Sequence, residues 1–344
     1  MKRLLIYFAG MGDLVVLIPL FRELAREGEL DLLTRPYGAP LFDGQDVVRR
    51  VHVLRHPNRG RWGAARAVFG YERRRLGGLL AAAGYDEIVV FGQERPVIRA
   101  WVDAWRGPAE VRVMRYPERD PDRVRIGLAS LGMSAEGLDP LPVLHAADTE
   151  RAEARRLLAP LGRHVAGVQV GSGPVNRRWR PPPNRKGLTP AQWAGLLEHV
   201  LDSGHVDALV FNGTVRETRE VRPVLSAIKP SYRARVHDWT GRTDIPRLRG
   251  LLSLYRAYLS IDTGPAHMAA ALGCPLLVFF GPSDPAAYRM KGRAPVEAVV
   301  GSAPCQFCTG TRLFKTCRDN ICLNRIPVET LRAGWDRLAG RTAA

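Results

Sequence analysis

The sequence lacks any uncharged apolar run of about 18 residues, the length that a membrane-spanning helix requires. Cysteine is also scarce: only five occur among 344 residues, and four of these lie between Cys305 and Cys322. This distribution excludes a disulfide scaffold spread through a secreted domain and favours the reducing cytoplasm. We therefore expect a cytoplasmic protein, either soluble or peripheral on the inner face of the cytoplasmic membrane.

Acidic residues are few, with 34 Asp and Glu against 51 Lys and Arg, so the formal net charge is +17. The positive excess favours phosphorylated substrates, nucleic acid or an anionic membrane surface as partners. The stretch 49–75 concentrates this charge, with nine arginines and a single acid. It is a solvated face, a nucleic-acid patch or a surface for phosphorylated lipid. Because no nucleic-acid fold signature accompanies it, we expect an anionic acceptor or a headgroup layer, with Arg61 on the acceptor side, and no nucleic-acid partner.

Hydrophobic segments alternate with amphipathic ones through both halves of the chain. Strands are predicted at 4–8, 30–34, 51–54, 87–91, 111–114, 164–170, 206–211, 257–261 and 275–280. Helices are predicted at 14–27, 190–203, 215–228, 244–255, 265–272 and 328–338. This βαβα rhythm is typical of an α/β protein with doubly wound parallel sheets. We expect two Rossmann-like domains, 1–150 and 151–344, facing each other across a cleft where the carboxyl ends of the strands converge.

A glycine-containing turn, Gly10-Met11-Gly12-Asp13, follows the first predicted strand. Glycines at such a turn let a ligand approach the backbone, and the start of a helix favours negative charge. The spacing is not the Gly-x-Gly-x-x-Gly dinucleotide fingerprint, and an acidic residue here would repel a pyrophosphate. Asp13 is therefore either a base that faces the cleft or a helix cap.

The segment 260–267 joins another predicted strand to a helix. Thr263 and Gly264 lie where backbone N–H groups have no partner within the helix, and Pro265 suits the first helical turn. His267 falls in the same turn, as either a structural or a functional residue. Together these features predict a phosphate cradle at a helix end.

A second candidate phosphate site is the turn Gly171-Ser172-Gly173, which follows the strand predicted at 164–170. Cations come after it, among them Arg178 and Lys186. The alternative interpretation is an ordinary loop.

The remaining motif is the cysteine group near the end of the chain. Cys305 and Cys308 have the spacing of a zinc knuckle, and Cys317 and Cys322 follow within a short distance. Four thiolates in one segment predict a structural zinc or iron site. Reduced cysteines and a local disulfide are the alternatives.

Taken together, these segments resemble glycosyltransferase family 9, the ADP-heptose:lipopolysaccharide heptosyltransferases. The resemblance extends over nearly the whole chain, in the family's order. It is carried by GMGD (10–13), IPLFREL (18–24), YDEIVV (85–90), VGSG (170–173), DWTGRT (238–243), DTGPAH (262–267) and GPSDP (281–285). Residues 262–267 are the most specific of these matches.

The resemblance implies a GT-B fold and an inverting transfer that needs no metal or other cofactor. It places the general base on Asp13, with Gly10 and Gly12 on the acceptor side. The implied donor-binding residues are Asp262, Thr263, Gly264, His267, Ser172 and Gly173. The family's donor-phosphate lysine falls on Lys186, because its spacing to Trp193 resembles the family's. Arg178, which lies beside Trp179, is the second choice, and the three prolines at 181–183 look like an insertion.

The chemistry agrees with this assignment. Inverting transfer needs one carboxylate to take the acceptor proton, and cations or N–H dipoles to stabilise the leaving nucleotide diphosphate. A glycosidase would need a carboxylate pair about the scissile bond, and no local pair is present. The resemblance implies ADP-heptose as the donor and an anionic glycolipid or other glycan as the acceptor. Lipopolysaccharide core synthesis, or that of a related glycoconjugate, is therefore the implied role.

Two other functions remain open on the sequence alone. One is a related GT-B enzyme that uses another nucleotide sugar, or that glycosylates a protein or a secondary metabolite. The other is a non-enzymatic protein that binds nucleic acid or membranes, for which the charge of +17 is the support.

Overall fold

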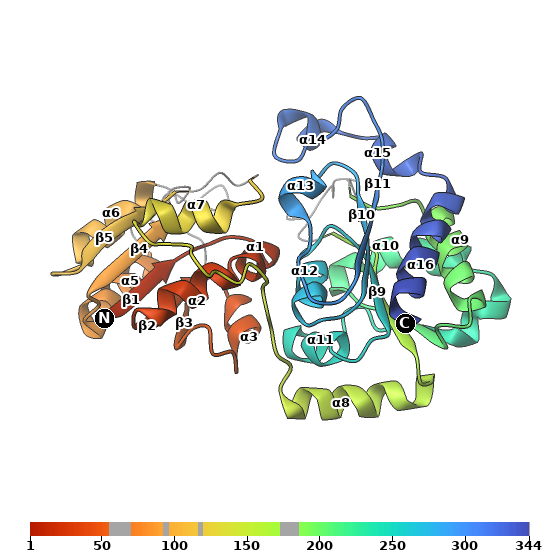
Figure 1. Ribbon diagram of the computed structural model, residues 1–344, viewed down its shortest axis with the longest axis horizontal. Helices are drawn as coiled ribbons and strands as arrows, with labels where there is room; N and C mark the ends of the chain where they lie inside the picture. Colours follow the sequence, from red (N-terminus) through yellow and green to blue (C-terminus); the bar gives the residue numbers. More distant parts are fainter. Residues whose placement is uncertain (55–69, 92–95, 116–119, 173–185, 344) are drawn as a thin grey trace. The chain divides into compact units, whose positions relative to one another are not determined.

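The computed structural model describes residues 1–54, 70–91, 96–115, 120–172 and 186–343. The chain divides into two compact units, Met1–Pro142 and Val143–Ala344, each with its own sheet (Figure 1). The parallel α/β architecture predicted from the sequence is confirmed in both units, because every strand pair within the two sheets is parallel.

The first unit contains a five-stranded sheet in the order β3-β2-β1-β4-β5. Its strands are β1 (Lys2–Ile6), β2 (Glu29–Thr34), β3 (Arg50–Val53), β4 (Glu87–Phe91) and β5 (Glu110–Met114). The chain runs outward from β1 through β2 to β3 and then returns to β4 beside β1. The topological switch point of this sheet therefore lies between β1 and β4, where ligands of such sheets bind.

Helices cover both faces of this sheet (Figure 1). They are α1 (Met11–Val16), α2 (Ile18–Arg26), α3 (Gly38–Phe42), α5 (Tyr71–Ala83), α6 (Pro96–Trp105) and α7 (Arg123–Ser130). The single helix predicted at 14–27 is wrong, since α1 ends at Val16 and α2 begins at Ile18, with Leu17 between them. Pro19 explains the break, because proline has no N–H to continue the hydrogen-bond ladder of α1 and suits the first turn of a new helix.

The second unit contains a six-stranded sheet in the order β11-β10-β9-β6-β7-β8. Its strands are β6 (Val165–Gln169), β7 (Ala208–Phe211), β8 (Val236–Asp238), β9 (Ala257–Ile261), β10 (Leu276–Phe280) and β11 (Val296–Val300). The chain proceeds from β6 outward to β8, and then from β9 outward to β11 on the other side. The switch point therefore lies between β6 and β9.

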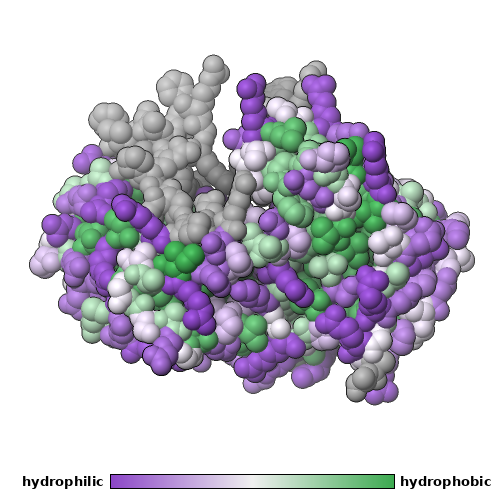
Figure 2. Space-filling model, turned by 45° about the horizontal axis from the view of Figure 1, so that its top comes forward, coloured by the Kyte–Doolittle hydropathy of each residue, from purple (hydrophilic) through white to green (hydrophobic). Residues whose placement is uncertain are grey.

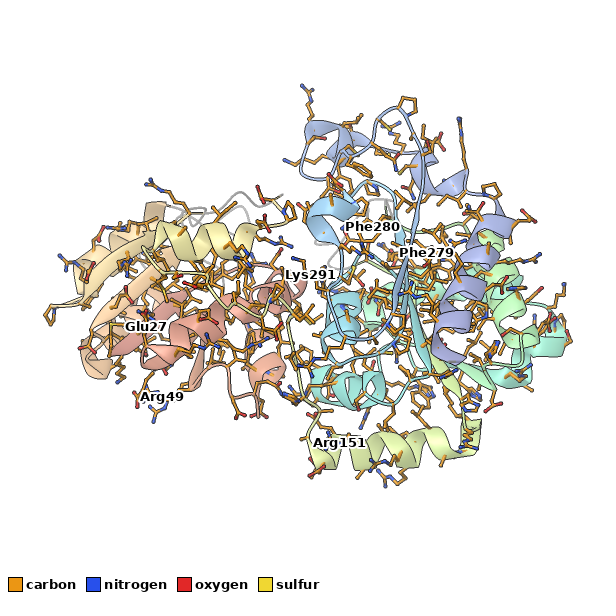
Figure 3. All side chains as sticks on the ribbon, viewed as in Figure 1. Glu27, Arg49, Arg151, Phe279, Phe280 and Lys291 are labelled. Carbon is orange, nitrogen blue, oxygen red and sulfur yellow. The ribbon has the colours of Figure 1, made fainter. Side chains whose placement is uncertain are left out.

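The helices of this unit are α8 (Asp148–Leu158), α9 (Pro190–Asp202), α10 (Thr218–Ala227), α11 (Ile245–Leu252), α12 (Gly264–Ala271), α13 (Pro285–Tyr288), α14 (Arg312–Thr316), α15 (Ile321–Asn324) and α16 (Val328–Ala343). Helices α9, α10 and α16 share one hydrophobic core with the sheet. Trp193 of α9 meets Phe279 of β10 edge to face at 5.4 Å within this core. Figure 3 labels Phe279 and its neighbour Phe280, and both are almost completely buried.

Helix α8 spans the boundary expected at residue 150, and the whole helix belongs to the second unit. Two ion pairs attach it to α11: Arg249 lies 2.5 Å from Glu150, and Arg247 lies 2.8 Å from Glu153. The Arg249 side chain is only 2% exposed, so this buried ion pair holds α8 against the second unit.

On the face drawn in Figure 2, hydrophilic residues surround smaller hydrophobic patches. In the part of the chain that the structure describes, every helix is too short or too polar to cross a membrane.

Candidate functional site

The strongest candidate site lies at the switch point of the second sheet. Strand β9 ends at Ile261, and Asp262 and Thr263 connect it to the first residue of α12. Strand β6 lies beside β9 in the sheet, and the turn that follows β6 contains Gly171 and Ser172. Because parallel strands end at one edge, the two predicted phosphate turns lie side by side at the position where such sheets bind ligands.

Asp262 is the centre of a charged group in this site. Its Oδ2 lies 2.5 Å from the Lys186 ammonium and accepts a hydrogen bond of 2.5 Å from the Ser283 hydroxyl. Its Oδ1 lies 3.8 Å from Nε2 of His267. Three of the residues predicted to bind the donor, Asp262, Lys186 and His267, are therefore brought together.

The carboxyl of Asp262 is ionised in this setting. Burial alone would raise its pKa, but the charges of Lys186 and His267 and the hydrogen bonds from Lys186 and Ser283 hold the pKa below its ordinary value. Asp262 is only 7% exposed, whereas the Lys186 side chain is 21% exposed. Lys186 is thus the more exposed member of the pair.

The amino end of α12 supplies a second source of positive potential. Thr263 is the residue that caps this helix, yet its side chain makes no capping hydrogen bond. Its hydroxyl instead lies 3.1 Å from that of Ser260. Among the described residues, the first-turn N–H groups, beginning at Gly264, receive no side-chain cap and can bind an anion.

The turn after β6 is held by a buried glutamate. Gln169 donates a 2.9 Å hydrogen bond to one carboxylate oxygen of Glu217, and the Thr214 backbone N–H donates a 2.6 Å bond to the other. A Cβ atom on Gly171 would lie 2.5 Å from the Glu217 side chain, so this position requires glycine. Ser172 follows, whereas Gly173 and Arg178 lie outside the described residues.

In the first unit, Asp13 lies at the start of α1, at the switch point between β1 and β4. Its Oδ2 accepts a hydrogen bond of 3.1 Å from the Gly10 N–H, so the carboxylate satisfies one of the backbone donors at the helix start. Gly10 is the N-cap residue and Gly12 lies within α1. The Asp13 Oδ1 lies 4.0 Å from the Arg123 guanidinium. The Asp13 side chain is 42% exposed, so the carboxylate is accessible to a ligand.

The Arg-rich stretch is described only in part, and Arg61 lies outside the described residues. Its first residue, Arg49, is labelled in Figure 3 and pairs with Asp31 at 2.8 Å and with Glu29 at 2.9 Å. Asp31 also accepts a hydrogen bond from the Tyr85 hydroxyl at 2.8 Å. Arg49 therefore neutralises carboxylates of β2 and stabilises the sheet.

The cysteine group follows β11: Cys305 and Cys308 precede α14, Cys317 directly follows it, and Cys322 lies in α15. None of the five cysteines forms a disulfide. The local-disulfide alternative is therefore wrong. Burial, together with the thiols of Cys305, Cys308 and Cys317, raises the pKa of Cys322 to about 11, so these three thiols lie near enough to Cys322 to disfavour its ionisation. Among the described residues, however, no group of three or more His, Cys, Asp or Glu side chains has an arrangement that could hold a metal ion.

Two site residues were not identified from the sequence, Ser283 and Glu217. Ser283 falls within the GPSDP segment that carries the family resemblance, which is a signal for its loop but not for its contact with Asp262. Glu217 lies three residues after Thr214, a spacing typical of a capping box, which indicates a helix start but not a partner on β6.

Comparison with known proteins identifies the family of this chain. The model of glycosyltransferase family 9 (heptosyltransferase) matches residues 135–312, which is more than half of the chain. The lipopolysaccharide heptosyltransferase 2 of Escherichia coli is 28% identical over 93 residues, and the protein of that name from Salmonella typhimurium is 27% identical over 93 residues. Each match spans only 27% of this chain and 26% of the relative.

Solved structures are similar over the whole chain. E. coli ADP-heptose lps heptosyltransferase II has a TM-score of 0.72 at 20% identity, with 100% of both chains covered. E. coli heptosyltransferase WaaC with ADP-2-deoxy-2-fluoro heptose has a TM-score of 0.63 at 18% identity, covering 98% of this chain and 99% of that one. The iron-containing dodecameric glycosyltransferase TibC of enterotoxigenic E. coli has a TM-score of 0.55 at 13% identity, covering 98% of this chain and 78% of that one. These similarities show a GT-B fold, and the family match shows that the chain belongs to glycosyltransferase family 9, the heptosyltransferase family.

Proposed function

We propose that this protein transfers a heptose from ADP-heptose to a hydroxyl of an acceptor, with inversion at the sugar carbon and without a catalytic metal. The observation that carries the proposal is the group formed by Lys186, Asp262 and the uncapped start of α12 at the switch point of the second sheet. Membership of the family supports the reaction class, and the ADP and ADP-sugar complexes of its structural relatives support the donor.

In this proposal the donor diphosphate lies against the first turn of α12, where Thr263 and Gly264 present backbone N–H groups. Lys186 lies beside this turn and places its ammonium against the same phosphates. Charge that develops on the leaving ADP is stabilised by these groups, which are already in position before the reaction begins. Ser172 and His267 complete the donor site.

Asp262 would accept hydrogen bonds from the sugar hydroxyls. The reason is electrostatic: a buried carboxylate repels phosphate, but it is a strong acceptor for hydroxyl donors. A ligand that carries a diphosphate and a polyol at adjacent positions therefore suits this site better than either group alone.

Asp13 is the proposed general base, and Gly10 and Gly12 leave room for the acceptor beside it. Its carboxylate is accessible, as a base requires, and one base of this kind contributes about 10²–10⁴-fold to the rate. The proposed acceptor is an anionic glycolipid of the lipopolysaccharide core or a related glycan, reached from the cytoplasmic side of the membrane. The net charge of +17 supports an anionic acceptor.

A structural metal at the cysteine group is a separate part of this proposal. Four neighbouring thiols are a suitable donor set for zinc or iron, and the structural relative TibC contains iron. As they are placed here, the thiols do not have the arrangement of a metal site, so loading would require the loops to move. Elemental analysis of protein purified without chelator tests this, and less than about 0.1 equivalent of either metal would refute it, because a structural tetrathiolate site binds tightly.

The experiment for the main proposal compares ADP-heptose with GDP- and UDP-sugars. Binding is measured by calorimetry on the full chain, transfer by mass spectrometry on a heptose-deficient glycolipid acceptor, and the anomeric configuration of the product by NMR. We expect ADP-heptose to bind most tightly and to give a product of inverted anomeric configuration. Tighter binding and turnover with another nucleotide sugar would replace the donor assignment by the alternative GT-B function. Failure of every nucleotide sugar to bind would reject the transferase function itself.

A further inference from the structure

The cysteine-bearing segment 301–326 contacts the donor site at two separate points. Thr309, which directly follows Cys308, places its hydroxyl 3.1 Å from that of Ser283. Its backbone N–H also donates a 2.9 Å hydrogen bond to the Pro282 carbonyl. Ser283 in turn donates to Asp262, so a continuous chain of contacts runs from the cysteine segment to the Lys186 ammonium.

The direction of these hydrogen bonds follows from proton counting. A serine hydroxyl has a single proton, and the ionised Asp262 accepts it at 2.5 Å. In the contact between Thr309 and Ser283, the threonine must therefore be the donor. Ser283 is completely buried, so loss of this donor would leave its oxygen with an unsatisfied lone pair and a less defined rotamer.

The second point of contact is Asn320, which lies between Cys317 and Cys322. Its side-chain amide donates a 2.7 Å hydrogen bond to the carbonyl of Gly187, the residue after Lys186. Its backbone has φ of 47°, a left-handed conformation that asparagine tolerates better than most residues. Glycine would suit this backbone equally well but has no amide, so asparagine satisfies both requirements at this position.

We propose that Thr309 and Asn320 are positioning residues, through which the cysteine segment fixes the Asp262 carboxylate and the Lys186 ammonium relative to each other. Thr309 acts on Asp262 by way of Ser283, and Asn320 acts on the backbone that carries Lys186. This inference rests on the proposed function for its effect on donor binding, but the contacts themselves do not depend on which donor is used.

The test uses Thr309→Val, which removes the hydroxyl at nearly constant volume, and Asn320→Gly, which keeps the left-handed backbone. Thr309→Ser retains the hydroxyl and should restore wild-type behaviour. Thr316→Val is the matched control, because within the described part of the chain the Thr316 hydroxyl bonds to carbonyls of its own helix, α14, in the same segment. Thermal unfolding of each variant checks that the second unit remains folded.

Two readouts are measured. The first is the acylation rate of Lys186, followed by peptide mass spectrometry, which reports on the amine without any donor. We expect Thr309→Val and Asn320→Gly to raise this rate. The second is ADP binding, which we expect each variant to weaken by about 3- to 10-fold, the effect of losing one hydrogen bond. In the transfer assay the loss should fall on KM for the donor more than on kcat.

The two proposals fail in different ways. If the wild-type protein binds no ADP or ADP-sugar, the proposed function is rejected, while the Lys186 acylation rates still decide whether Thr309 and Asn320 position the amine. If both variants stay within about twofold of Thr316→Val in acylation and in binding, the range typical of neutral surface substitutions, the positioning role is overturned.

Discussion

Asp13 combines two roles that substitution can separate. Its Oδ2 accepts the Gly10 N–H at 3.1 Å, and its negative charge lies at the start of α1. Asp13→Asn keeps a carbonyl oxygen for the Gly10 N–H and loses only the charge, at a cost of about 0.3–1 kcal/mol in stability. Asp13→Ala also loses the hydrogen bond, which adds about 0.5–1.5 kcal/mol. Both variants lack a base, so both should lose about 10²–10⁴-fold in kcat.

The assay measures three quantities on the same preparations: the transfer rate, the affinity for ADP and the free energy of unfolding in urea. A base that acts only in the chemical step predicts equal losses of kcat in the two variants, unequal losses of stability, and unchanged ADP affinity. If Asp13→Asn keeps its rate to within about fivefold while Asp13→Ala is inactive, the residue acts through the helix start, and the assignment of the base is refuted.

Three further outcomes follow from the donor site. Lys186→Met should weaken ADP binding, measured by calorimetry, by about 10- to 100-fold, because a charge-assisted contact is lost. Lys229→Met removes an exposed cation of the same unit and should leave the affinity for ADP unchanged. Gly171→Ala should lower the free energy of unfolding by about 1–3 kcal/mol in urea titration, because the new methyl group would collide with Glu217. The pKa of Asp262 in the folded protein lies below its ordinary value of 3.8, so the ionised carboxylate stabilises the fold at any pH above that value. This stabilisation is lost as the pH falls through the folded-state pKa. Asp262→Asn should therefore make the free energy of unfolding depend less on pH in the acid range.

The central strands were predictable because parallel strands are buried on both faces and need no alternation of polar and apolar residues. Strands β4 and β9 occur at the residues that the apolar runs indicated, 87–91 and 257–261. The edge strands β8 and β11 were missed. Strand β8 has only three residues, and both strands are partly exposed, so their sequences carry no long apolar run.

The residues of the donor site were predictable only as separate motifs. Sequence placed Asp262 and His267 at a helix start, and the family resemblance favoured Lys186 over Arg178. It did not indicate that Ser283 donates to Asp262, or that Glu217 fixes the turn after β6, because those contacts join residues 21 and 48 positions apart. Such contacts depend on the order of the strands in the sheet, and local propensity does not determine that order.

The pair of Lys186 and Asp262 also limits how a donor can bind. A buried carboxylate is stable only while it has partners, and Lys186 is its charged partner at 2.5 Å. A diphosphate that draws the ammonium toward itself therefore weakens the support of Asp262, and repulsion between the two anions adds to the cost. Hydroxyl groups on the sugar reverse both effects, since they donate to Asp262 while the phosphates engage Lys186 and the start of α12. On this reasoning the buried carboxylate is what makes the site prefer a nucleotide sugar over the nucleotide diphosphate that leaves it.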